Sequence, residues 1–357
     1  MRTPLINAGI LDVLCEQARS EVAGLRLNSM WALKHLVWGA DTELRKRAVD
    51  RLTPGLLVRL ITADTEDENL FRRMRSQEDS NDEDEDMDGD DCGDGNKPWT
   101  WPAMKEFESV AAGFMRPAVP ARMLQAEKKL LALRSRDVEL NPERRARNND
   151  LAIQEQGLHL IQNLISLPPS AEGYETAAGQ VEMVDYVFDQ LGKDRLFEIM
   201  AQKLRIKVLH PFARRSSSGP LGHSSNPRAG SVGANDSRVL YPQAKMIGAV
   251  VGILVHVAAS IPRHRQLVMA QTELLKLLVN HFNNRDAEVR KQLCWMLNNL
   301  ALQENGADRA DCAQRTQELR RLGFLSKLEG LEQGDGELDV RERAKLAAHE
   351  LKKEPLA

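Results

Sequence analysis

The stretch AEVRKQLCWMLNNLAL, at positions 287–302, decides the fold. Its apolar residues recur at the spacing of an α-helix, and no proline or glycine interrupts it. A second stretch, LRLNSMWALKHLV at positions 25–37, has the same pattern, with a stripe formed by Leu27, Met30, Leu33, Leu36 and Val37. Two similar helices so far apart in one chain indicate a repeat architecture.

The other ordered segments also predict helices of about ten to twenty residues. These are residues 43–60, with a break at Pro54 and Gly55, and residues 151–167, 244–259, 267–282, 316–331 and 339–353. The segment 244–259 is apolar on nearly every side, so we expect it inside the array. No convincing alternation typical of a strand is present. Aromatic residues make up only 4 % of the chain, which also favours an all-α fold.

The helices recur as variants of one unit. Gly9-Ile10-Leu11 near the start corresponds to Gly323-Phe324-Leu325 near the end, and each is followed by a second amphipathic helix. Aligning these later helices pairs residues four positions apart. The pairs are Trp31/His35, His159/Asn163, Gly252/His256, Trp295/Asn299 and Lys345/His349. Residues four apart lie on the same face of a helix, so the pairs form a ladder across successive units.

The ladder spacing locates two insertions. The second members of the pairs are 128, 93, 43 and 50 residues apart, whereas a unit of this kind needs roughly 40–47. The two long intervals contain an acidic segment and a Ser/Gly/Pro-rich segment. From Glu78 to Asp94 there are eleven acidic residues and no basic ones. We expect this block to be a solvated, disordered insertion, or alternatively an autoinhibitory strip on the basic remainder of the chain.

The Gly-apolar-apolar turn and the W-x-x-x-N helix resemble the armadillo repeat. We therefore predict an all-α, armadillo-type α-solenoid, a right-handed superhelix of about five repeats with long disordered insertions. The resemblance implies that the third helices line a groove that binds a partner. The groove residues would be Asn28, Trp31, His35, Gln156, His159, Asn163, His256, Gln292, Trp295, Asn299 and His349. The alternative for each Trp is a place in the core; for the set, we favour a groove.

A more specific resemblance is to the C-terminal half of the armadillo-repeat subunit family of GID/CTLH ubiquitin ligases, in a filamentous-fungal form. It is carried by LNSMWALKHLVWGAD (27–41), LAIQEQGLHLIQNLIS (151–166) and the tail, where NLALQENG precedes QELRRLG. The resemblance implies a non-catalytic scaffold that holds a substrate receptor for ubiquitin-dependent proteasomal degradation, located in the cytoplasm and nucleus. Its partners would be the other ligase subunits. The chain begins at a mid-repeat helix, so we expect an N-terminally truncated gene model.

This alignment divides the chain into five parts. They are residues 1–64 (a first, incomplete repeat and the start of the second), 65–149 (the acidic insertion), 150–209 (repeats), 210–241 (the Ser/Gly/Pro-rich loop) and 242–353 (the C-terminal repeats). Within the acidic insertion, Trp99 and Trp101 are expected either to dock onto the array or to form a short linear motif for another subunit.

Composition excludes several other classes. No run of about 18 apolar residues predicts a membrane span, and no apolar leader opens the chain. The four cysteines, Cys15, Cys92, Cys294 and Cys312, are scattered, which argues against a disulfide framework or a zinc site. Without the eleven acidic residues of the insertion, 41 acidic residues face 49 basic ones, a net charge of +8.

No catalytic motif is present: we find no G-x-S-x-G, P-loop, H-E-x-x-H or G-x-G-x-x-G pattern. Histidines on neighbouring repeats would lie ~10 Å apart, too far to share one metal ion. We therefore expect no enzyme activity, no cofactor, no metal, no membrane partner and no nucleic acid partner. The alternative function is a peptide-binding armadillo adaptor of the nuclear-transport or catenin type. The scaffold is favoured because Trp295/Asn299 is the only complete pair.

Overall fold

The computed structural model describes residues 2–64, 142–167, 174–209 and 238–353. The described residues 2–63 and 149–353 belong to one compact unit. This unit contains the repeats. The acidic block, Trp99, Trp101 and the Ser-rich segment up to residue 237 lie outside the described residues, so their predictions stay predictions.

The described helices form five successive sets of three. They are α1 (Arg2–Asn7), α2 (Ile10–Gln17) and α3 (Ala23–Val37); α4 (Thr42–Leu52), α5 (Pro54–Thr62) and α9 (Pro142–Ile165); α10 (Tyr174–Leu191), α11 (Lys193–Leu204) and α12 (Ala244–Ala259); α13 (Pro262–Met269), α14 (Thr272–Val279) and α15 (Ala287–Ala301); and α16 (Arg309–Arg321), α17 (Phe324–Gly334) and α18 (Leu338–Lys352). We number these sets repeats 1 to 5. The prediction of an all-α, armadillo-type solenoid is confirmed.

The turn between the first and second helix of a repeat depends on local backbone chemistry. Gly9 and Gly323, which the sequence aligned, both have a positive φ, of 78° and 89°, directly before α2 and α17. Glycine adopts this left-handed conformation at no steric cost because it has no Cβ. In repeat 2 the place is taken by Thr53, whose side chain accepts a hydrogen bond from the Leu56 amide at the start of α5.

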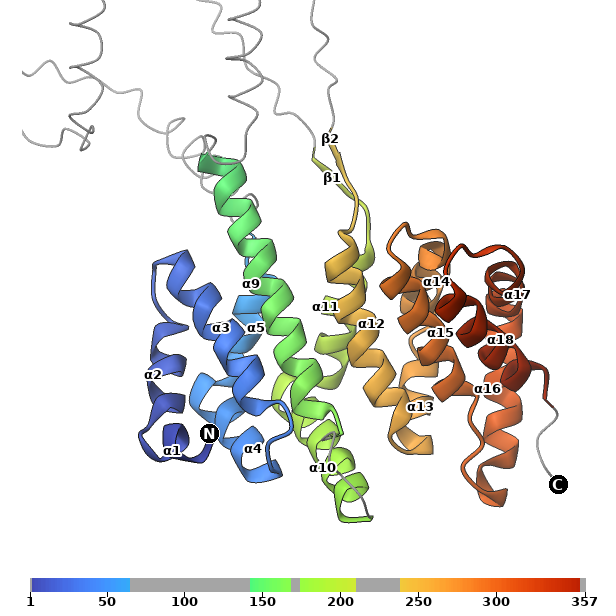
Figure 1. The fold of residues 1–357 in the computed structure, drawn as a ribbon, viewed down its shortest axis with the longest axis horizontal. Coiled ribbons are helices and arrows are strands. Elements are labelled where there is room, and N and C mark those ends of the chain that lie inside the picture. The colour runs from blue at the N-terminus through green and yellow to red at the C-terminus, as the bar shows by residue number, and fades with distance from the viewer. Residues whose placement is uncertain (1, 65–141, 168–173, 210–237, 354–357) are drawn as a thin grey trace, which may run out of the picture. The chain divides into compact units, whose positions relative to one another are not determined.

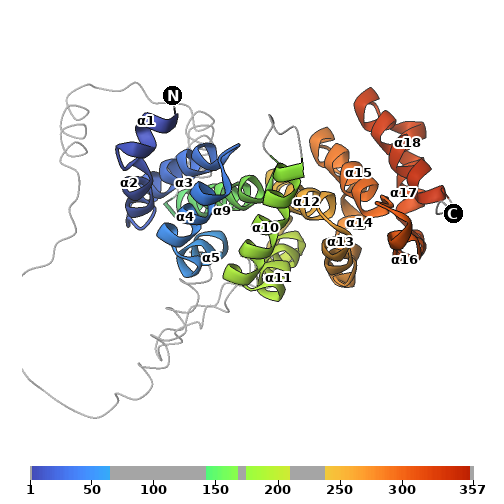
Figure 2. The ribbon, with the colours of Figure 1, turned by 90° about the horizontal axis from the view of Figure 1, so that it is seen from below.

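The third helices α3, α9, α12, α15 and α18 follow one another side by side in both views of the ribbon (Figures 1 and 2). A recurring hydrogen bond fixes their register. Asn163 Nδ2 donates to the Lys34 carbonyl over 2.9 Å, and Asn299 Nδ2 donates to the Val255 carbonyl over 3.1 Å. Lys34 and Val255 each precede a ladder histidine by one residue. Equivalent atoms therefore meet twice, in the register that the sequence alignment predicted.

The core is continuous along the repeats. One hydrophobic cluster extends from Leu11 in α2 to Leu351 in α18, so each repeat buries its apolar residues against its neighbours. In α12, eleven of sixteen residues are buried, which confirms the expectation that this helix lies inside the array. Among the described helices, none is long and apolar enough to serve as a membrane span.

Buried arginines bind the ends of third helices. Arg265 Nε donates to the Ala258 carbonyl at the end of α12, and Arg315 Nε donates to the Leu300 carbonyl in the last turn of α15, both over 2.9 Å. Arg45 Nη1 makes the same kind of contact with Leu164 in α9 over 3.0 Å. A cation at a helix C-terminus donates hydrogen bonds to the free carbonyl groups and interacts favourably with the negative end of the helix dipole. These roles of the arginines could not be predicted from residue spacing.

Arg315 also forms a buried ion pair. Its Nη1 and Nη2 donate to the two carboxylate oxygens of Asp308 over 2.8 and 2.9 Å, and both side chains are almost fully buried. Burial acts most strongly and raises the pKa of Asp308, but the hydrogen bonds from Arg315 and the Glu304 amide and the charges of Arg315 and Arg265 together outweigh it, so the pKa lies below its usual value. The carboxylate is therefore charged and paired inside repeat 5.

Three local predictions were wrong. Residues 316–331 are not one helix, because α16 ends at Arg321 and α17 begins at Phe324. Residues 267–282 are not one helix: α13 ends at Met269, α14 begins at Thr272, and the 3-10 helix η3 (Asn280–Asn283) follows. The turn at Ala270 and Gln271 contains neither glycine nor proline, so no residue type there predicts a break. A short antiparallel ribbon also exists, with β1 (Lys207–Leu209) paired to β2 (Arg238–Leu240). Three-residue strands are too short for a detectable alternation.

Candidate functional site: the face of the third helices

The two ladder tryptophans lie at equivalent positions and are half-exposed. Trp31 on α3 is 55 % exposed and Trp295 on α15 is 47 % exposed, so neither is a core residue. The Trp31 ring packs edge-on against His35, with 4.5 Å between ring centroids. The Arg343 guanidinium lies over the Trp295 ring, 5.2 Å from its centroid. Large rings that keep one side open are the typical anchors of protein interfaces.

The two ladder asparagines are engaged within the solenoid. Asn299 is buried and uses its amide N–H on Val255, while the half-buried Asn163 uses its amide N–H on Lys34. The ladder pattern in the sequence predicts that these amides face a partner. In this structure their donors join neighbouring third helices, and they thereby fix the spacing of the face on which Trp31 and Trp295 stand.

The ladder glutamines present a different feature. Gln156 and Gln292 occupy equivalent positions, and their amide nitrogens donate to Glu155 and Glu288 over 3.4 and 3.3 Å. The Oε1 atoms of both are buried and have no hydrogen-bond partner among the described residues. An unpartnered buried acceptor costs about 1–3 kcal/mol. Rotation of the side-chain amide would turn this acceptor outward, at the cost of the hydrogen bond from Nε2 to the glutamate. Asn28, the equivalent residue on α3, is exposed.

Three of the ladder histidines, His35, His159 and His256, have a lowered pKa and are neutral at neutral pH. Burial, helped by the charge of Arg45, lowers the pKa of His256 to about 4. Burial also lowers the pKa of His159, whose Nδ1 lies 3.0 Å from Gln162 Oε1, and of His35. His349 on α18 is exposed. In the described part of the chain, no cluster of His, Cys, Asp or Glu could hold a metal ion.

A side chain of the preceding repeat occupies the space beside the lost ladder position in α12. A Cβ added to Gly252 would lie 2.7 Å from the Gln162 amide carbon and oxygen of α9. These atoms are the far end of a flexible side chain, so Gln162 would shift to admit a Cβ, and the packing does not require glycine here. The Gln162 amide makes the middle of the face polar, and the two indoles stand on either side of it, on α3 and α15.

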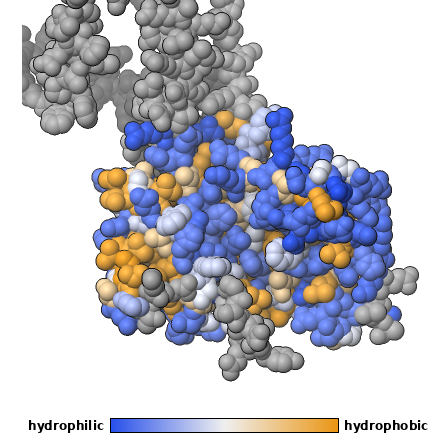
Figure 3. Space-filling model, in the orientation of Figure 1, coloured by the Kyte–Doolittle hydropathy of each residue, from blue (hydrophilic) through white to orange (hydrophobic). Residues whose placement is uncertain are grey.

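The hydropathy of the surface differs between the N-terminal and the central helices. On the side of the molecule turned toward the viewer in Figures 1 and 3, hydrophobic residues gather at the left, over the N-terminal helices, and hydrophilic residues predominate over the central ones. Besides Trp31, the exposed large apolar residues of α3 and its C-cap are Leu25 and Trp38. We call the eleven predicted residues on α3, α9, α12, α15 and α18 the ladder face. Its role as a partner site stays a prediction.

Fold and ladder face together define the class: the described chain is an armadillo-type α-solenoid. No protein-family model matches the sequence. Over 61 residues, 17 % of this chain, the sequence is 30 % identical to armadillo repeat-containing protein 8 of Danio rerio. The match spans 9 % of the length of that relative.

Two designed armadillo repeat proteins are among the solved structures to which the chain is similar. One is a designed armadillo repeat protein in complex with a (KR)4 peptide, with a TM-score of 0.48 and 13 % identity over 98 % of this chain and 85 % of that chain. Another is a computationally designed armadillo repeat protein for modular peptide recognition, with a TM-score of 0.47, 13 % identity and the same coverage. At these values the assignment of the fold rests on the helix packing described above.

Proposed function

We propose that this chain is a non-catalytic armadillo scaffold of a GID/CTLH-type E3 ubiquitin ligase, which holds the substrate receptor on its ladder face. The observation that carries the proposal is the pair of half-exposed indoles, Trp31 and Trp295, at equivalent positions of stacked third helices. The likeness to armadillo repeat-containing protein 8 supports the ligase assignment. The ligase partners and the cytoplasmic and nuclear location are part of this proposal.

The chemistry of the face favours a protein segment as the occupant. Apolar side chains of the segment would lie against the indoles of Trp31 and Trp295, which offer large areas at low entropic cost. The amide oxygens of Gln156 and Gln292, turned outward, would accept hydrogen bonds from backbone N–H groups of the segment. Binding would thereby relieve two unpartnered acceptors.

The test compares the wild-type chain with Trp295→Ala in affinity purification from the source cell. The indole is half-exposed, so its loss should leave the melting temperature nearly unchanged. Truncation of an interface anchor often costs about 2 kcal/mol or more, which corresponds to about 30-fold in affinity. We expect RING, LisH/CTLH and SPRY subunits with the wild type, and selective loss of the receptor with the variant.

Two outcomes contradict different parts of the proposal. If the variant keeps its melting temperature and still retains the receptor fully, the ladder face is not the binding site. If the wild type instead purifies with nuclear-transport or junction proteins and no ligase subunit, the ligase assignment is wrong and the adaptor function replaces it. Gln317→Ala, at an exposed position on α16, is the matched control and should change neither result.

A further inference from the structure

The connection between α15 and α16 contains a pair of residues that occurs nowhere else in the sequence. Asn305-Gly306 is the only Asn-Gly pair among the 357 residues. Both residues are exposed, and neither belongs to the ladder face. An asparagine before a glycine loses its side-chain amide readily, because glycine has no Cβ to hinder attack by its own backbone nitrogen.

The backbone nitrogen of Gly306 is accessible. Gly306 is the first residue of the 3-10 helix η4 (Gly306–Asp308), so its N–H has no carbonyl partner within that helix. A Cβ added to Gly306 would meet nothing within 4 Å, and its φ is not positive. The space around this nitrogen is therefore open, and neither packing nor backbone conformation requires glycine at this position.

The side-chain amide of Asn305 is polarised by the fold. Asn305 is the N-cap of η4, and its Oδ1 accepts a hydrogen bond from the Asp308 backbone N–H over 3.1 Å. A donor at this oxygen stabilises the negative charge that develops on it when the amide carbon is attacked. An activated amide carbon and an accessible backbone nitrogen are thus adjacent in the chain.

We propose that Asn305 is a site of spontaneous deamidation. The Gly306 nitrogen attacks Cγ of Asn305: the N–Cγ bond forms, the Cγ–Nδ2 bond breaks, and Nδ2 leaves as ammonia with the proton from Gly306. Water then opens the resulting five-membered imide at one of its two carbonyl groups. The product is an aspartate, or an isoaspartate whose main chain passes through Cγ. The reaction consumes one water and releases one ammonia, and it is independent of the proposed ligase function.

An isoaspartate at position 305 would alter the start of repeat 5. The Asn305 carbonyl accepts hydrogen bonds from the Asp308 amide over 3.2 Å and from Gln303 Nε2 over 3.1 Å. A main chain that passes through Cγ displaces both this carbonyl and the capping oxygen. Asp308 holds the carboxylate that pairs with Arg315. Isoaspartate should therefore weaken repeat 5, whereas an ordinary aspartate keeps a capping oxygen and should not.

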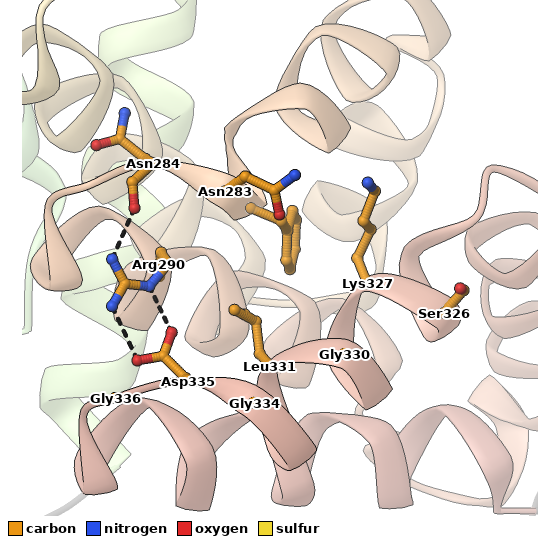
Figure 4. Close-up of a pocket in the computed structure, with 11 residues that line it drawn as sticks. Asn283, Asn284, Arg290, Ser326, Lys327, Gly330, Leu331, Gly334, Asp335 and Gly336 are labelled. Carbon is orange, nitrogen blue, oxygen red and sulfur yellow. Dashed lines mark hydrogen bonds and ion pairs between the residues drawn. The ribbon is translucent and has the colours of Figure 1, made fainter.

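Asn284 provides an internal control. Its Oδ1 also accepts from a backbone amide, that of Asp286, over 2.9 Å. Together with Asn283 it lines the hollow beside η3 and α17 (Figure 4). The residue that follows Asn284 is Arg285, whose side chain hinders attack by its backbone nitrogen. The amide of Asn284 should therefore persist while that of Asn305 is lost.

The test incubates the folded full chain at mildly alkaline pH and follows it by tandem mass spectrometry after tryptic digestion at mildly acidic pH. Peptide 292–309 reports on Asn305, and peptide 277–285 reports on Asn284. We expect the acid to accumulate at position 305 and not at position 284. In Gly306→Ala the rate should fall at least about tenfold, because the added methyl group hinders the attack.

Thermal unfolding tests the structural consequence. The melting temperature of the incubated wild type should fall by about 2–4 °C, because hydrogen bonds at the start of repeat 5 are lost. Asn305→Asp and incubated Gly306→Ala should keep the melting temperature of the fresh wild type.

Three results overturn the proposal. In the first, Asn305 keeps its amide in the folded chain while the urea-unfolded chain loses it, which would show that the fold protects this residue. In the second, Gly306→Ala reacts as fast as the wild type. In the third, the deamidated wild type melts at the same temperature as Asn305→Asp, so that no isoaspartate disturbs repeat 5. The added Cβ of Gly306→Ala meets no neighbour, so a slower reaction in this variant cannot be attributed to a changed fold.

Discussion

At the residue scale, the buried guanidinium of Arg315 does more for the fold than any surface ion pair. It neutralises Asp308 and binds the carbonyl groups of Leu300 and Leu302, at the end of α15. Exposed pairs such as Arg343–Asp339 contribute little, because water and salt screen them. The difference follows from burial: a charge without a partner in the interior has no water to stabilise it.

We therefore predict that Arg315→Met lowers the free energy of unfolding by about 3–5 kcal/mol, since it removes both hydrogen bonds of the guanidinium to buried Asp308, whose other ion pair, with Arg265, is longer at 3.8 Å. Urea denaturation followed by circular dichroism measures this. The control is Arg309→Met, at an exposed position on the same helix, which should change stability by less than about 0.5 kcal/mol. Equal losses in the two variants would show that the buried pair has no special role.

At the element scale, the asparagine hydrogen bonds hold the third helices in register. Asn299 reaches from α15 to the Val255 carbonyl of α12, and Asn163 reaches from α9 to Lys34 of α3. Because the bond recurs at equivalent positions, it is a property of the repeat and not of one residue. The half-exposed indoles depend on this register, because Trp31 and Trp295 each lie one helical turn before the second residue of their pair, His35 and Asn299.

Asn299→Ala should lower the free energy of unfolding by about 1–2 kcal/mol, because a buried hydrogen bond between two helices is lost. Asn298→Ala removes the same chemical group from the neighbouring position, which is half-buried, and is the matched control. Thermal unfolding of both variants gives the comparison. If Asn298→Ala is as costly as Asn299→Ala, the interhelical bond does not set the stability of this element.

Much of the structure of the repeats could be predicted from the sequence. The apolar stripe of α3, the aligned turns at Gly9 and Gly323, and the ladder register all follow from spacing, because a solenoid repeats the same contacts. The engagement of Asn163 and Asn299, the position of Gln162 beside Gly252 and the role of Arg315 could not be predicted. Each depends on which atom of a neighbouring repeat comes close, and a spacing pattern does not contain that information.

At the scale of the whole molecule, long connections occur at equivalent places. The chain leaves α5 at Thr62 and re-enters at Pro142 of α9, and it leaves α11 at Leu204 and re-enters at Ala244 of α12. Both are connections from the second to the third helix of a repeat. Each repeat contacts only its neighbours, and loop closure costs grow slowly with length, so such insertions are compatible with an intact stack.

The proposed function requires that the ladder face binds a segment of a partner protein. A photo-crosslinking amino acid placed at Trp31 or Trp295 in the source cell tests it most directly, with Gln317 on α16 as the control position. We predict that positions 31 and 295 crosslink to the same protein, a substrate receptor, and that position 317 does not. No crosslink from either indole position, or the same protein crosslinked from position 317, would contradict it.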